Sequence, residues 1–161
     1  CNAAYPVARD AVLRAHPWNF AIRRADLAVE SVTPAFEYTY QFPLPSDFLK
    51  IIRTEDESAG FTDDYRIEST SSGLRLMSNN DTVAIEYIAQ ITDVALFDAL
   101  FVDCLAQRIA GEIAPAFAES ASMAKDIWNI YEAKLREARG VDAQEGTPRD
   151  PVVDTWVIAR V

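Results

Sequence analysis

The sequence predicts an α+β fold in which a small antiparallel β-domain is inserted into a helical bundle. Apolar residues follow helical spacing near both ends of the chain, whereas residues 18–90 show short apolar runs separated by turn residues. Half of the 161 residues are hydrophobic, which is enough to bury a core. We therefore expect one domain over residues 1–145, followed by an extended, strand-like tail over residues 146–161.

The first predicted helix covers residues 3–15 and ends before Pro17, because a residue that precedes proline is disfavoured in a helix. We expect this helix to continue from sequence that precedes Cys1. Trp18–Val29 is compatible with a strand or with a second helix, and we favour an extended segment. The apolar residues at helical spacing in the first helix are Val7, Ala8, Ala11, Val12 and Ala15.

The middle of the chain is predicted to be a β-domain. Phe36–Phe42 is the clearest strand, because aromatic residues alternate with polar ones. The acidic segment Glu55–Asp64 is predicted to be a loop. We expect the strands to form one antiparallel meander of five or six members. The other expected strands are Phe48–Thr54, Tyr65–Ser69, Leu74–Met77 and Thr82–Ile88.

Two helices are predicted after the strands, over residues 94–114 and 121–139. Thr92 or Asp93 is expected to cap the first, and Pro115 to bend or end it. The second helix is expected to begin after a cap at Ser120 or Ser122 and to end at Gly140. The apolar stripe of the first helix predicts core, and it consists of Phe97, Leu100, Phe101, Cys104, Leu105, Ile109 and Ile113. Small residues that would let another helix approach closely are Ala106, Ala110, Gly111 and Ala114.

Charge and composition argue against several classes of function. The net charge is -10 and the chain has no run of basic residues, which disfavours binding to nucleic acid or to anionic membranes. Cys1, Cys104 and His16 are too few ligands for structural zinc. The sequence has no apolar stretch of about 18 residues, so no membrane span is predicted.

No sequence motif indicates an enzyme. Nucleophile-elbow, phosphate-loop and dinucleotide-binding patterns are absent. His16 is interpreted as a packed or surface histidine, and Cys104 as a buried free thiol. The acidic segment lacks the alternating ligands of a calcium loop. We expect neither catalysis nor a cofactor or metal.

The tail is predicted to carry an isolated strand, Asp154–Val161, behind a linker with two prolines. A lone strand is unstable, so it must pair with this domain's own sheet edge or with another chain. We favour the second alternative. The expected interface residues are Trp156, Val157, Ile158 and Val161.

Four local features, taken in order, resemble one protein family. They cover roughly residues 1–144, but the acidic segment and the tail are not matched. The first is His16–Ala21 with Arg24–Leu27; the second is Tyr38–Phe42 with Leu44–Leu49 and Lys50–Arg53; the third is Val83–Ile88 with Asp93 and Phe97-Asp98; and the fourth is the alanine-rich helix to Pro115 with Leu135, Ala138, Asp142 and Ala143. The chain is similar to the phage head–tail adaptors related to the tail tubular protein A of short-tailed phages.

The resemblance implies a non-enzymatic virion subunit at the head–tail junction, made in the bacterial host cytoplasm. It implies a ring, commonly a dodecamer, that binds beneath the portal protein and extends the channel for genome ejection. A tail nozzle or tail tube protein would assemble on it, and DNA would pass through the lumen without specific binding. The alternatives are another neck or tail-completion protein, a cytoplasmic α+β ligand-binding module, or an enzyme with an unrecognised site.

Overall fold

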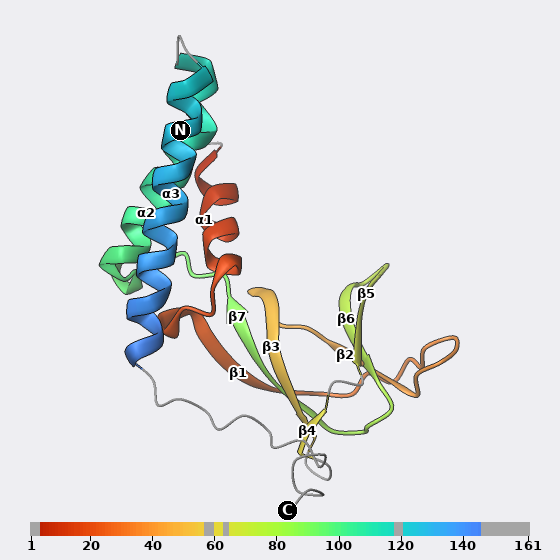
Figure 1. Ribbon diagram of the computed structural model, residues 1–161. Helices are drawn as coiled ribbons and strands as arrows, with labels where there is room; N and C mark the ends of the chain where they lie inside the picture. Colours follow the sequence, from red (N-terminus) through yellow and green to blue (C-terminus); the bar gives the residue numbers. More distant parts are fainter. Residues whose placement is uncertain (1–3, 57–59, 63–64, 118–120, 146–161) are drawn as a thin grey trace, which may run out of the picture.

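The computed structural model describes residues 4–56, 60–62, 65–117 and 121–145 of the chain (Figure 1). It has the mixed α+β fold that the sequence predicts, with helices at one end of the molecule and two antiparallel sheets at the other. The predicted tail, with Trp156, Val157, Ile158 and Val161, lies outside the described residues.

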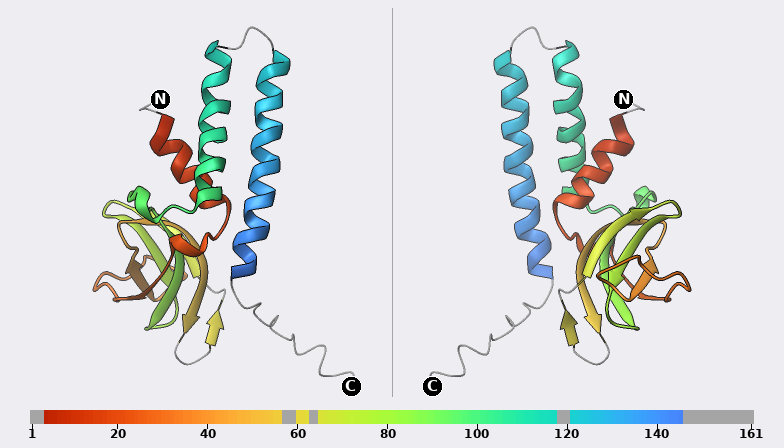
Figure 2. Two further views of the ribbon diagram at one scale, coloured as in Figure 1. Left: turned by 90° about the vertical axis from the view of Figure 1, so that its left-hand side faces the viewer. Right: turned by 90° about the vertical axis from the view of Figure 1, so that its right-hand side faces the viewer.

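Three helices form one row. They are α1 (Ala4–Ala15), α2 (Ala99–Phe117) and α3 (Ala121–Asp142). Figure 2 shows α2 and α3 as an antiparallel hairpin, with α1 beside only the lower part of α2. Helix α2 therefore contacts both α1 and α3, and α1 and α3 run in the same direction. Three short 3-10 turns complete the helical part, at Asn19–Ala21 (η1), Val94–Leu96 (η2) and Ala143–Glu145 (η3).

The strands form two sheets, so the expectation of a single meander is wrong. One sheet has the order β1-β7-β3-β4 and the other has the order β2-β6-β5. Only β3–β4 and β5–β6 pair as neighbours in sequence among the described strands, because pairing is decided by which apolar faces can be buried together, and β7 is buried between β1 and β3. The strands are β1 (Ile22–Leu27), β2 (Tyr40–Pro43), β3 (Phe48–Asp56), β4 (Gly60–Thr62), β5 (Tyr65–Thr70), β6 (Gly73–Ser78) and β7 (Val83–Ala89).

Two predictions in the β-domain need correction. Phe36–Phe42 is not one strand, because Glu37 has a φ of 72°, outside the extended region, and Phe36 is 79% exposed. The alternation there continues into a real strand only from Tyr40. The acidic segment is not all loop either, since β3 extends to Asp56 and pairs with β4.

The helix ends also differ from their predicted positions. The helix expected at 94 begins at Ala99, because Asp98 accepts hydrogen bonds from the backbone of Leu100 and Phe101, while Asp93 caps only η2. Helix α2 passes through Pro115 but ends two residues later.

Helix α3 begins at Ala121, so Ser122 lies inside it and is not its cap, while Ser120 is outside the described residues. Gly140 does not end α3, which continues to Asp142. A glycine that ends a helix usually takes a positive φ, and among the described glycines only Gly73 has one.

The core joins the helices to the four-stranded sheet. The fully buried ring of Trp18 meets Phe101 edge to face at 5.3 Å, and its indole N–H donates to the carbonyl of Val12 at 2.9 Å. Phe101, Cys104 and Leu105 of the predicted α2 stripe are buried, as expected.

Candidate interaction surfaces

The α2–α3 hairpin is closed by one tight contact. Trp128 of α3 packs on Gly111 of α2, where a β-carbon would come within 3.0 Å of the indole ring. The Arg108 guanidinium lies 4.9 Å from the centre of the Trp128 ring and also pairs with Glu112 at 2.9 Å. The small residue predicted to admit another helix therefore does so, and the Arg108 guanidinium also lies against the ring.

Three large apolar side chains of this hairpin are exposed among the residues that the structure describes. Val102 and Ile130 are 46% and 47% exposed, and Val141 is 44% exposed. Ile130, Lys134 and Val141 are separated by four and seven residues and so lie on one side of α3, where Lys134 pairs at 2.7 Å with Asp103 of α2. We call Ile130, Lys134, Val141 and Asp103 the hairpin face. Its one internal ion pair is neutral, and the hydrogen bond to Asp103 raises the pKa of Lys134.

Helix α1 also carries an exposed apolar residue, Val7. Ala8 and Val12 of α1 are buried, whereas Val7 is 64% exposed and Arg14, two turns later, is also exposed. Val7, Ala11 and Arg14 lie on the side of α1 opposite its buried stripe, because they are separated by four and three residues. We call these three residues the α1 edge.

The lower ends of α1 and α3 are joined by a cluster of hydrogen bonds around Asp142. Its carboxylate is 2.9 Å from the His16 Nε2 atom and accepts a hydrogen bond of 3.1 Å from the Asn19 backbone, while its carbonyl accepts from the Asn19 side chain at 2.8 Å. Arg139 donates to the carbonyl of Ala15 at 2.6 Å. We call this group the Asp142 clasp. It holds the end of α3 against the turn that leads into β1.

Asp47 forms a similar joint within the sheet. Its carboxylate pairs with Arg23 at 2.5 Å and accepts a hydrogen bond of 3.0 Å from the Tyr87 hydroxyl. Its carbonyl accepts from the backbone of Gln90. Burial, together with the hydrogen bond to Asp47, raises the pKa of Tyr87. The joint fixes the turn before β3 against β1 and β7.

The outer side of the four-stranded sheet carries a row of charges. Glu86 is 5% exposed and lies between Arg53, at 2.5 Å, and Arg24, at 3.5 Å, on the neighbouring strands. Buried carboxylates are costly unless they are paired, and two guanidinium groups meet that need. Arg75 pairs with Glu30 at 2.8 Å on the other sheet, and hydrogen bonding to Arg75 lowers the pKa of Glu30.

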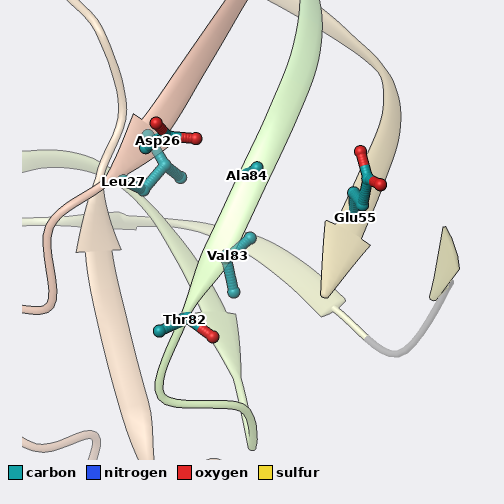
Figure 3. Close-up of a pocket in the computed structure, with 6 residues that line it drawn as sticks. All are labelled: Asp26, Leu27, Glu55, Thr82, Val83 and Ala84. Carbon is teal, nitrogen blue, oxygen red and sulfur yellow. The ribbon is translucent and has the colours of Figure 1, made fainter. Parts of the chain in front are cut away.

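A cavity of about 440 Å³ lies beside this charged row. Asp26 and Glu55 both stand opposite Ala84 in the register of the sheet. Figure 3 shows the two carboxylates on strands either side of the small Ala84 side chain. Across the described ranges, no group of three or more His, Cys, Asp or Glu side chains is placed to hold a metal ion.

The individual sequence predictions for functional residues have different outcomes. His16 is packed, as expected, because it contacts Trp18 edge to face as well as Asp142. Cys104 is a buried free thiol, as expected, and burial raises its pKa. The hairpin face and the α1 edge were not anticipated. No local signal identifies the first, because the exposure of Ile130 and Val141 depends on how α3 packs against α2.

No protein-family model matches the chain, and no curated protein sequence matches it either. Among the helices that the structure describes, none is both long and apolar enough to cross a membrane.

Proposed function

We propose that the chain is a structural subunit of a phage head-to-tail connector. It forms a ring beneath the portal protein, extends the DNA channel and carries the tail. The observation that supports this most is that features of the resemblance far apart in sequence bond to each other, the first to the fourth and the second to the third.

Two joints carry this argument. His16 and Asn19 belong to the first feature and bond to Asp142 of the fourth. Asp47 of the second feature accepts a hydrogen bond from Tyr87 of the third. These hydrogen bonds stabilise the fold itself, whichever residues lie on its surface. The resemblance therefore includes residues that hold the framework of the fold together, which supports the proposal.

Surface properties support assembly and a DNA channel. Exposed apolar residues on the helices favour contact with another protein. The net charge of -10 suits a lumen that DNA passes without specific binding, because the acidic surface repels phosphate. We propose a dodecamer whose partners are its own copies, the portal protein and a tail nozzle or tail tube protein.

The tail is assigned to partner binding in this proposal. Trp156 would anchor Asp154–Val161 on a neighbouring subunit or on the portal, since aromatic residues dominate interface energies. A deletion of residues 154–161 is expected to leave the monomer folded, with an unchanged circular dichroism spectrum, and to abolish assembly. An unfolded deletion variant would instead assign the segment to the domain's own sheet.

The decisive experiment combines the purified chain with the portal protein of the same phage and images the mixture by negative-stain electron microscopy. Stacked rings on the portal are expected, and their symmetry gives the copy number. If the chain does not bind the portal, the connector proposal is refuted, and the other neck or tail-completion roles become the hypotheses to test.

The cavity over Ala84 favours a second candidate, a ligand-binding module. That candidate predicts a stable monomer whose melting temperature rises with a small cationic ligand between Asp26 and Glu55. Thermal-shift screening with amines and guanidines would separate the two candidates. The module would be favoured if a ligand raises the melting temperature of the monomer and Ala84→Leu abolishes that rise, because the larger side chain fills the space between the carboxylates.

A further inference from the structure

The row of three helices is incomplete by itself. Domains usually bury helices in two packed layers, but within the described part of the chain no strand lies over the hairpin face. Among the described side chains of α1, α2 and α3, four large apolar ones are exposed. Val7 lies on the α1 edge, Ile130 and Val141 lie on the hairpin face, and Val102 lies on α2.

We propose that the hairpin face of each subunit receives the α1 edge of the next copy of this chain. The inference deepens the proposed function and rests on it for the ring. Because the two patches differ and lie on different helices, the contact is heterologous, and a heterologous contact that closes on itself generates a ring.

The positions along the helices support this pairing. Val7 and Arg14 are seven residues apart, as are Ile130 and Glu137, so each pair lies on one side of its helix. Helices α1 and α3 run in the same direction. A match between Val7 and Ile130 therefore also places Arg14 beside Glu137.

The Asp142 clasp sets the required level within each subunit. Its hydrogen bonds join residues that are 123 to 126 positions apart, and Val7 and Ile130 differ by a similar number. Val7 is about 12 Å above Ala15, and Ile130 is about 14 Å above Arg139, at 1.5 Å per helical residue. Rotation about an axis parallel to α3 leaves these levels unchanged. Because α1 is inclined to α3 (Figure 2), only part of its rise counts as height, and neighbouring copies present Val7 and Ile130 at similar heights.

Charge favours the same arrangement. The full chain carries -10, so two copies repel at long range. The hairpin face is internally neutral through Asp103 and Lys134. Arg14 and Glu137 bring opposite charges together at the end of the contact. Arg14 has donors to spare, since it uses one to bind the Leu49 carbonyl.

The test uses the full chain in sedimentation-velocity experiments up to millimolar concentration. Val7→Asp and Ile130→Asp each place a charge in the contact and are expected to weaken self-association about 100-fold. Val32→Asp is the matched control, because Val32 is 61% exposed and lies on neither surface. Circular dichroism and the melting temperature establish that each variant is folded.

Mixing the variants tests the geometry. Val7→Asp keeps an intact hairpin face and Ile130→Asp keeps an intact α1 edge, so an equimolar mixture is expected to form dimers and nothing larger. Self-association of either variant alone at the wild-type level would overturn the proposal, as would a wild-type chain that stays monomeric throughout. A monomeric wild-type chain would not refute the connector proposal, since the portal can template a ring through other contacts. Association through these surfaces without portal binding would refute the connector alone.

Discussion

Replacing each of the two helical glycines with alanine should change stability in opposite directions. Gly111 and Gly140 lie in α2 and α3, where alanine is favoured over glycine by about 1 kcal/mol. Around Gly140 there is no atom within 4 Å of a new β-carbon. Gly140→Ala should therefore stabilise the protein by about 0.5–1 kcal/mol.

Gly111→Ala meets a different environment. The new methyl group would lie 3.0 Å from Trp128 Cε2 and 3.1 Å from Cζ2, and the Arg108 guanidinium also lies against this indole. Overpacking of this kind costs about 1–3 kcal/mol, which exceeds the helical gain. Subtracting the helical gain of about 1 kcal/mol leaves a net loss of up to about 2 kcal/mol, or up to about 8 °C in melting temperature for a chain of this size.

Urea unfolding of the two variants, followed by far-ultraviolet circular dichroism, measures both changes against one reference. The midpoints should move in opposite directions at constant slope, because neither substitution alters the surface exposed on unfolding. If Gly111→Ala were stabilising to the same degree as Gly140→Ala, the indole would have room to move. The tight closure of the hairpin described above would then be wrong.

Three further predictions concern the joints and the core. Asp142→Ala removes the two hydrogen bonds accepted by the clasp carboxylate and should cost about 2 kcal/mol in urea unfolding; a loss below about 0.5 kcal/mol would show that the clasp is solvated. Cys104, in a Cys1→Ser background, should resist iodoacetamide in the native protein and react after denaturation, because burial raises its pKa and shields it; rapid native labelling, followed by mass spectrometry, would contradict this. Burial and the hydrogen bond to Asp47 raise the pKa of Tyr87 in the folded state. The contribution of Tyr87 to folding stability is therefore complete below the ordinary tyrosine pKa of about 10, and it is lost as the pH rises through the pKa of Tyr87 in the folded protein. Tyr87→Phe should make alkaline unfolding less steep, and an unchanged pH profile would remove Tyr87 from that transition.

Local sequence patterns predicted the elements whose environment is local. The strand at Thr82–Ile88 was placed within a residue or two, because β7 is buried on both sides and its composition shows it. Phe36–Phe42 failed for the opposite reason. Its alternating pattern continues through Glu37, whose backbone turns into the left-handed region. Strand order failed too, because pairing of β1 with β7 joins segments about 60 residues apart and leaves no trace in local periodicity.

The candidate surfaces show a similar division. The burial of Cys104 followed from helical periodicity, and so did the burial of Phe101 and Leu105 on α2. The hairpin face required knowledge of which sides of α2 are taken by α1 and α3, and only the tertiary arrangement supplies it. The predicted tail interface, from Trp156 to Val161, lies outside the described residues and stays a prediction.

The Asp142 clasp connects folding to the proposed assembly. Among the described residues, α3 is held mainly by its hairpin partner α2 and by this joint, whereas α1 is continuous with β1 through the turn that the clasp contacts. A shift of α3 by one turn would move Ile130 by about 5.4 Å relative to Val7 and bring Glu137 out of reach of Arg14. The clasp therefore does more than close the fold, because it keeps two surfaces of one subunit at the same level. A ring requires that agreement, since any offset repeated from copy to copy would produce an open helix.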